Sequence, residues 1–210
     1  MKKDLTKIII VRHGESLANA AGIYLGHTDW DLSELGKEQA RVVADYLAEE
    51  KLDAIYSSDL IRAYNTALPH AQMRGMEIIR SRQLREIYLG DWEGRLVKEL
   101  ECDYPEEFVI GWRQGFGTCV PPNGEAVMDV GARIYDELVR IGTLHRGGTV
   151  LVACHAAAIR ALWAIVTGTP PCEVAEKIPF PKNASCTTVI FDGEVLVPVS
   201  YGDAHYFENE

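Results

Sequence analysis

The chain has 210 residues, of which 47% are hydrophobic and 25% are charged, and this composition excludes disordered and collagen-like proteins. A chain of this length can bury a sizeable core, so we expect a single domain over residues 1–210. The formal net charge of −10 argues against nucleic acids and anionic membranes as partners, and an anionic substrate would need basic residues concentrated at one place.

Strands and helices are expected to alternate in the first third of the chain. A short β-branched run predicts a buried strand over residues 7–11. Ser33 is a suitable N-cap for a helix that reaches about residue 49. A second strand is expected over 53–57, and Asp59 is expected to cap the helix that follows, which should end near residue 74.

The middle of the chain is expected to hold a short strand at 77–80 and then an irregular segment. Residues 88–124 are rich in Trp, Tyr, Gly and Pro, and insertions of this kind commonly form lids or walls around a substrate. Trp92, Trp112 and Phe116 are expected to pack within this lid first and to contact substrate second.

The last third returns to alternating elements. A helical stripe begins at Val127 and stops before Gly147, an apolar strand covers 149–154, and the helix after it ends at Gly168. Two further strands are expected at about 187–191 and 194–199. Together these elements predict an α/β fold with three αβα layers, in which a mostly parallel sheet has helices on both faces.

Arginine and histidine side chains follow three of the predicted strands. Arg12 and His13 come directly after the first strand, Arg62 lies one turn into the helix after the second, and His155 follows the third. Ligands of a parallel sheet bind outside the carboxyl ends of its strands. We therefore expect these four side chains to meet at one edge.

These residue types suit phosphoryl transfer. Guanidinium groups bind pairs of phosphate oxygens and stay charged at neutral pH, and helix N-termini after the two histidines would add backbone donors. A neutral imidazole can attack phosphorus while a nearby carboxyl group protonates the leaving alkoxide. The residue types therefore predict an enzyme that transfers a phosphoryl group, with a histidine available as the nucleophile.

The ordered motifs resemble the histidine phosphatase superfamily, in the branch that includes cofactor-dependent phosphoglycerate mutases. The resemblance extends over residues 7–191 and implies a phosphoglycerate mutase-like fold. The segments that carry it are Arg12-His13-Gly14-Glu15-Ser16 with Asn19, Ser57-Ser58-Asp59-Leu60 with Arg62, Leu84-Arg85-Glu86, Gly90-Asp91-Trp92-Glu93-Gly94, and His155 before a helix.

The resemblance also implies residue roles. His13 would be the catalytic nucleophile, and Glu86 would act first as general acid and then as the base that activates water. His155 would take part in catalysis beside them. The residues that would hold the phosphoryl oxygens or line their pocket are Arg12, Arg62, His155, Asn19 and Gly26.

Three features leave parts of this assignment open. The family usually has glycine after the second histidine, whereas this chain has Ala156, whose methyl group would crowd the approach of the backbone to phosphate. Residues 122–126 match the family's Gly-Gly-Glu-Ser segment only in part, which weakens any role for Glu125. Four other carboxylates are alternatives to Glu86 as general acid: Asp91 and Glu93, which are close to it in the sequence, and Glu15 and Asp59, which are expected at the same edge of the sheet.

Three functions within the resemblance compete. We expect a phosphatase that acts on a small phosphorylated metabolite, because the mutases of the family are longer. The second is a phosphoglycerate mutase, an isomerase, and the third is a phosphate-binding module with weak catalysis. The aromatic lid favours a ring-bearing monophosphate, but sugar phosphates and phosphoglycerate remain open.

A cysteine-based mechanism is a further alternative. Cys154 and Arg160 have the C-x5-R spacing of cysteine-dependent phosphatases. Three alanines between them favour a helix instead of a phosphate-binding loop.

Cysteines and histidines show no pattern typical of a disulfide framework or a metal site. We therefore expect a cytoplasmic protein that needs neither metal nor cofactor, and a homodimer is compatible with the sequence. The apolar run at 8–11 is far too short to span a membrane. The residues concerned are Cys102, Cys119, Cys154, Cys172 and Cys186, together with His27, His70, His145 and His205.

Overall fold

The computed structural model describes residues 4–118 and 120–207. Cys119 therefore lies outside the described residues. Within them, six strands form one sheet in the order β3-β2-β4-β1-β5-β6. The strands are β1 (Thr6–Arg12), β2 (Ala54–Ser58), β3 (Ile78–Ser81), β4 (Thr149–Cys154), β5 (Cys186–Phe191) and β6 (Leu196–Asp203).

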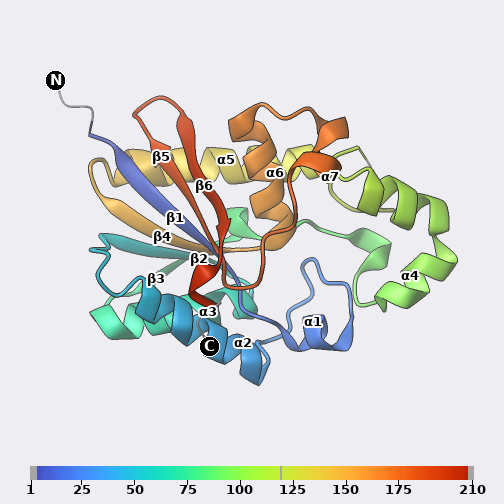
Figure 1. Ribbon diagram of the computed structural model, residues 1–210, viewed down its shortest axis with the longest axis horizontal. Coiled ribbons are helices and arrows are strands. Elements are labelled where there is room, and N and C mark those ends of the chain that lie inside the picture. Colours follow the sequence, from blue (N-terminus) through green and yellow to red (C-terminus); the bar gives the residue numbers. More distant parts are fainter. Residues whose placement is uncertain (1–3, 119, 208–210) are drawn as a thin grey trace.

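Helices cover both faces of this sheet, as the sequence predicts (Figure 1). One face packs against α5 and α6, and the other packs against α2 and α3. The helices are α1 (Leu17–Ala21), α2 (Glu34–Tyr46), α3 (Ile61–Arg74), α4 (Val97–Asp103), α5 (Val127–Leu144), α6 (Ala156–Thr167) and α7 (Val174–Lys177).

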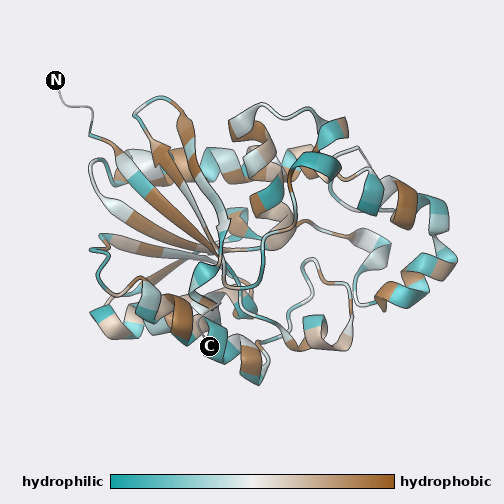
Figure 2. Ribbon diagram, viewed as in Figure 1, coloured by the Kyte–Doolittle hydropathy of each residue, from teal (hydrophilic) through white to brown (hydrophobic). Residues whose placement is uncertain are grey.

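The central strands are buried on both faces, and this explains why their sequences are continuous hydrophobic runs (Figure 2). Side chains of β1 alternate between the two layers. Ile8 and Ile10 belong to the core beneath α5 and α6, and Ile9 and Val11 belong to the core beneath α2 and α3. This alternation fixes β1 in the middle of the three-layer architecture.

Strand register brings the ends of three strands to one edge. Strands β2, β4 and β1 run parallel, with Arg12 opposite Cys154 and Ser57 opposite Ala153. Strands β5 and β6 are antiparallel to their neighbours. The expectation of a mostly parallel sheet is confirmed, and the residues after β1, β2 and β4 emerge side by side.

The start of α2 is as predicted, whereas the predicted cap of α3 is wrong. Ser33 caps α2 and its Oγ accepts the N–H of Gly36 at 3.0 Å. Asp59 does not cap α3, because both of its carboxylate oxygens accept N–H groups of Arg85 at 2.7 Å. The N–H of Ile61 at the start of α3 is bound instead by Asp29 at 2.8 Å.

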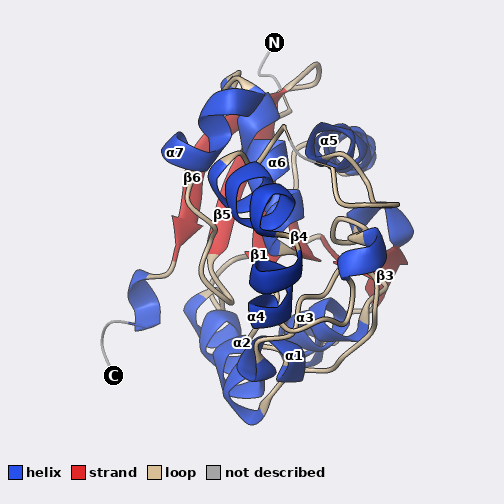
Figure 3. Cartoon of the chain, turned by 90° about the vertical axis from the view of Figure 1, so that its right-hand side faces the viewer, coloured by secondary structure: helices blue, strands red, loops and turns tan. Residues whose placement is uncertain are grey.

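The segment over 88–124 is more helical than the sequence predicts. It holds α4 and a π-helix over Pro105–Gln114, which lie beyond the carboxyl ends of the parallel strands (Figures 1 and 3). Trp92, Phe108 and Trp112 are buried there and contact one another edge to face. Aromatic packing, and not helix propensity, stabilises these short helices, so the sequence pattern alone did not reveal them.

Outside residues 88–124, the end of helix α6 agrees with the sequence prediction. Gly168 closes α6 in the left-handed conformation with φ of 67°, as expected for a glycine after a helix. Among the described residues, none of the helices combines the length and the apolarity needed to cross a membrane.

Candidate active site

A cavity of about 240 Å³ lies at the carboxyl ends of β1 and β4. It is bounded by the N-terminal part of the chain, by α3, by the segment after β3, by the π-helix and by the start of α6. The sequence-predicted residues that line it are Arg12, His13, Asn19, Arg62, Glu86 and Ala156. Of the remaining two predicted residues, His155 lies behind His13 and Gly26 lies behind Arg62.

His13 is held as a neutral imidazole. Its Nδ1 lies 2.7 Å from the carbonyl oxygen of Gly14, and because a carbonyl can only accept, Nδ1 carries the hydrogen. Burial, followed by the positive charges of Arg62 and Arg12, lowers the pKa of His13 well below 6.5. The Nε2 lone pair is therefore available at neutral pH, which is the state a nucleophile requires.

Two arginines bring positive charge next to this imidazole. Arg62 is buried and donates to the carbonyl oxygens of Gly26 at 2.7 Å and Thr28 at 3.1 Å. Arg12 donates through Nη1 to Pro181 at 2.6 Å. Burial lowers the pKa of Arg12 to about 10, so it remains protonated at neutral pH. The carbonyls fix both side chains but leave their charge unneutralised.

Some buried polar nitrogens near this end of the cavity have no hydrogen-bond partner among the described residues, and they include the donor Arg12 Nε and the single N–H of neutral His155. Arg12 Nε and both ring nitrogens of His155 make no hydrogen bond within the described part of the chain. Buried polar groups in native proteins are nearly always paired, so unpaired ones beside a cavity indicate a ligand. Positive charge with unpaired donors suits an anion.

His155 supports His13 from behind. The two ring centroids are 5.2 Å apart and the rings are inclined by 60°. Burial lowers the pKa of His155 well below 6.5, and Arg62 and His13 lower it further. His155 is therefore also neutral. The two histidine rings lie next to each other, as the sequence predicts.

Glu86 occupies the N-terminus of α6. Its carboxylate accepts the N–H groups of Ala157 at 3.1 Å and Ala158 at 2.9 Å, and also that of Ile87 at 2.9 Å. The sequence led us to expect these helix donors to face a phosphate. In the structure, the carboxylate binds two of them, so α6 orients Glu86 toward the cavity that both line.

Asn19 and Gly26 have different surroundings. Asn19 lines the cavity and closes a capping box with Ser16 at the start of α1. Gly26 is not among the lining residues. A Cβ at Gly26 would lie 2.3 Å from Glu93 Oε1 and 2.4 Å from the carbonyl oxygen of Ile87. Glycine is needed there because the loop presses against residues 87–93.

The C-x5-R alternative does not fit the structure. Cys154 is buried, its Sγ contacts the carbonyl oxygen of Leu84 at 3.4 Å, and burial raises the pKa of the thiol to about 12. Arg160 donates to the carbonyl of Ile178 at 2.5 Å and lies between the rings of Phe116 and Phe180. Neither side chain lines the cavity, so they do not form a phosphate-binding loop.

The outer part of the cavity contains residues that the sequence did not single out as substrate contacts. Tyr24, Leu25, Arg113 and Phe180 line it. Trp112 also lines it but is 1% exposed, which confirms the prediction that it packs first. Arg113 follows Trp112 on the π-helix, and helices of this irregular kind are frequent at functional sites.

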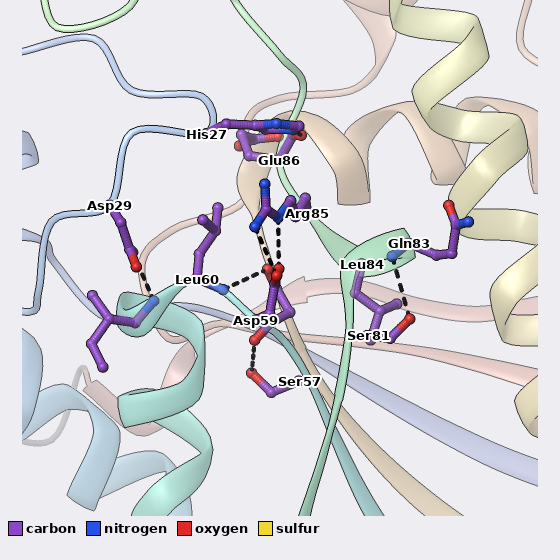
Figure 4. A network of polar contacts seen from close by, with 12 residues as sticks. His27, Asp29, Ser57, Asp59, Leu60, Ser81, Gln83, Leu84, Arg85 and Glu86 are labelled. Carbon is purple, nitrogen blue, oxygen red and sulfur yellow. Dashed lines mark hydrogen bonds and ion pairs between the residues drawn. The ribbon is translucent and has the colours of Figure 1, made fainter.

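A polar network surrounds the segment that carries Glu86. Figure 4 shows the two-bond ion pair between Asp59 and Arg85, with His27 lying against Glu86. His27 Nε2 is 2.9 Å from the carbonyl oxygen of Glu86. Glu125 accepts the N–H of Tyr88 at 2.8 Å, so it supports the same segment from outside.

The described residues contain no group of three or more His, Cys, Asp or Glu side chains that could hold a metal ion.

Comparisons with known proteins agree with this geometry. Phosphoserine phosphatase 1 from Hydrogenobacter thermophilus is 39% identical over 164 residues, covering 78% of this chain and 77% of the relative. Phosphoglycerate mutase-like protein 4 from Arabidopsis thaliana is 34% identical over 208 residues, covering 98% and 88%. The structure of a mycobacterial glucosyl-3-phosphoglycerate phosphatase in complex with VO3 superposes with a TM-score of 0.86 at 29% identity, covering 94% and 99%.

A family model confirms the resemblance that the motifs indicated. The model of the histidine phosphatase superfamily (branch 1) matches residues 8–204, nearly the whole chain. With His13 and the two arginines gathered at one cavity and the relatives just described, the chain belongs to branch 1 of the histidine phosphatase superfamily.

Proposed function

We propose that this phosphatase hydrolyses small phosphomonoesters through a phosphohistidine formed on His13. The observation that carries the proposal is the neutral His13 imidazole, with Nδ1–H bound to Gly14, beside the guanidinium groups of Arg12 and of the buried Arg62. Phosphoryl transfer depends mainly on positioning and on charge stabilisation, and this arrangement supplies both.

In the first step, Nε2 of His13 forms a bond to phosphorus while the bond to the ester oxygen breaks. Glu86, in its protonated form, gives its proton to the departing alkoxide, and the alcohol leaves. Arg12, Arg62 and His155 bind the phosphoryl oxygens during the transfer. The unpaired Arg12 Nε–H and the single N–H of neutral His155 support this role, because a phosphoryl oxygen can accept a hydrogen bond from each.

In the second step, water attacks phosphorus and the bond to Nε2 breaks. The Glu86 carboxylate takes a proton from the water, so inorganic phosphate leaves and both residues return to their starting state. Asn19 and Ala156 line the cavity at the phosphoryl end. Gly26 contributes indirectly, because its carbonyl oxygen accepts from Arg62.

We further propose that the substrate alcohol carries an acidic group. Arg113 lines the outer part of the cavity, and its side chain is 46% exposed and paired with Glu101. An exposed ion pair is worth little, so a substrate carboxylate can replace Glu101 at small cost. Relatives named for phosphoserine and glucosyl-3-phosphoglycerate act on esters that carry such a group.

The cavity of about 240 Å³ favours compact substrates. The four cysteines that the structure describes, Cys102, Cys154, Cys172 and Cys186, are free thiols, which supports a reducing compartment such as the cytoplasm.

Phosphoglycerate mutase is the second candidate, because a mutase-like relative matches 98% of the chain. The test offers the protein 3-phosphoglycerate with a bisphosphate primer and measures isomerisation and phosphate release together. We expect phosphate release to dominate, across a panel in which small acidic phosphomonoesters are preferred. Isomerisation faster than release would replace the phosphatase assignment with the mutase.

A further inference from the structure

Glu93 lies just outside the cavity and binds two separate segments of its wall. Oε1 accepts the N–H of His27 at 2.6 Å and that of Leu89 at 3.3 Å. Oε2 accepts both the N–H and the hydroxyl of Thr28, at 2.9 and 2.7 Å. Hydrogen bonds to an ionised carboxylate are stronger than those between neutral groups. One half-buried side chain therefore connects residues 27–28 with residue 89.

The first of these segments determines where Arg62 lies. The Arg62 guanidinium is bound by the carbonyl oxygens of Gly26 and Thr28, which flank the N–H groups that Glu93 accepts. Burial lowers the pKa of Arg62, and the negative charges of Glu86, Asp29 and Glu93 act against that decrease. Glu93 thus influences Arg62 both through the loop and through its charge.

The second segment begins with Glu86. His27 donates from Nε2 to the Glu86 carbonyl oxygen at 2.9 Å, so the loop and the Glu86 segment are also joined directly (Figure 4). The contact is close, because a Cβ on Gly26 would overlap the Ile87 carbonyl. Small displacements at this contact would change the separation between Arg62 and Glu86.

We propose that Glu93 is a positioning residue that holds the Arg62 loop against the Glu86 segment and so sets the phosphate clamp relative to the general acid. This inference rests on the proposed role of Glu86. Misplacing a catalytic group by about 1 Å can cost about a hundredfold in rate. The effect of Glu93 should therefore appear in proton donation to the leaving group.

The leaving group of the substrate provides the test. p-Nitrophenyl phosphate releases a stable phenolate that needs little protonation, whereas an alkyl phosphomonoester needs a proton from the general acid. For Glu93→Gln we expect the ratio of kcat/KM on the alkyl ester to kcat/KM on the aryl ester to fall about tenfold. Glutamine keeps the shape of the side chain but replaces one carboxylate oxygen by an NH2 group, which cannot accept the hydrogen bonds that this oxygen now accepts.

Two further variants make the result specific. Asp91→Asn is the matched control, because Asp91 is an exposed neighbouring carboxylate that contacts Asn123, and it should leave the ratio unchanged. Thr28→Val removes one bond to Glu93 at an exposed position and should lower the ratio about threefold. Thr28→Val decides the question if Glu93→Gln does not fold.

Glu86→Gln separates this inference from the proposed function. If Glu86→Gln lowers the ratio but Glu93→Gln and Thr28→Val do not, Glu93 has no positioning role. An equal loss on both esters in Glu93→Gln, together with a lower unfolding temperature, also overturns the inference, because that is a purely structural effect. An unchanged ratio in Glu86→Gln overturns the general-acid assignment and the inference with it.

Discussion

The two ends of the cavity are built in different ways. The phosphate end consists of four side chains at the ends of β1 and β4 and on α3, and backbone carbonyls fix most of them; the four residues are Arg12, His13, Arg62 and His155. The outer end is formed by residues of the π-helix and of loops, and its Arg113 is 46% exposed and already paired.

This difference separates chemistry from selectivity. The phosphate end keeps its charges in a water-poor environment, where electrostatic stabilisation is strong and geometry is fixed in advance. The outer end uses exposed charge, which binds weakly but can exchange partners. Substitutions at the phosphate end should therefore reduce turnover on every substrate, and those at the outer end should change substrate preference.

The largest effect is expected for His13→Ala. Loss of the nucleophile should lower kcat/KM on p-nitrophenyl phosphate by about a thousandfold or more, while the circular dichroism spectrum stays the same. His205→Ala is the control, because His205 is exposed and pairs with Asp203 far from the cavity. Wild-type turnover in His13→Ala would exclude the residue as nucleophile.

A smaller loss is expected for Arg62→Lys. A lysine keeps the charge but cannot bind the carbonyls of Gly26 and Thr28 and also present a planar pair of donors to phosphate. We expect kcat/KM to fall about a hundredfold on all phosphomonoesters. Arg74→Lys, at the other end of α3, should have less than a twofold effect. Arg74 is also held by backbone carbonyls, those of Leu47 and Glu50, but it does not line the cavity. Equal losses in the two variants would therefore contradict the role of Arg62 at the phosphate.

Arg113→Gln tests the outer end. It should raise KM about tenfold for a phosphomonoester that carries a carboxylate, leave kcat near the wild-type value, and change KM less than twofold for an uncharged alcohol. The matched control is Arg41→Gln, which removes an exposed arginine that pairs with Glu38. A loss that is the same for charged and uncharged substrates would show that Arg113 supports the fold and not selectivity.

The burial of three neutral histidines predicts a pH dependence of stability, and besides His13 and His155 they include His70, whose pKa burial lowers to about 3. The folded-state pKa values of His13 and His155 lie well below 6.5, so below pH 6.5 the unfolded chain binds protons that the folded chain does not. The free energy of unfolding should decrease as pH falls, by up to about 1.4 kcal/mol per pH unit for each histidine. Urea unfolding between pH 7.5 and 5.5 measures this slope.

His155→Gln provides the comparison for that slope. It removes one titrating imidazole, so its free energy of unfolding should depend less steeply on pH than that of the wild type. Carboxylates contribute equally to both proteins and cancel in the difference. Identical slopes would mean that His155 has the same pKa in the folded and unfolded chains, which would contradict its burial as a neutral imidazole.

The phosphate end was predictable from the sequence, because its residues follow apolar strands that pattern alone identifies. Arg12 is the last residue of β1, His13 follows β1 and His155 follows β4, so the rule that parallel strands end at one edge was enough to bring the three together. Helix α6 likewise followed from its apolar stripe and Gly168.

The outer end was not predictable in this way. The helices over 88–124 depend on contacts between rings such as Trp92 and Trp112, which are 20 positions apart and leave no periodic signal. Phe180 reaches the cavity from a loop after α7. Asp59 was predicted as a cap but pairs with Arg85, since a charged partner 26 positions away competes with the local helix.

The direct test of the account is to detect the phosphorylated residue during turnover. The protein is mixed with p-nitrophenyl phosphate and quenched in base, which preserves phosphohistidine, and the modified peptide is identified by mass spectrometry. We predict a phosphoryl group on His13, formed as fast as the burst of p-nitrophenol and missing from His13→Ala. A phosphoryl group on any other residue, or steady turnover with none on His13, would contradict the account.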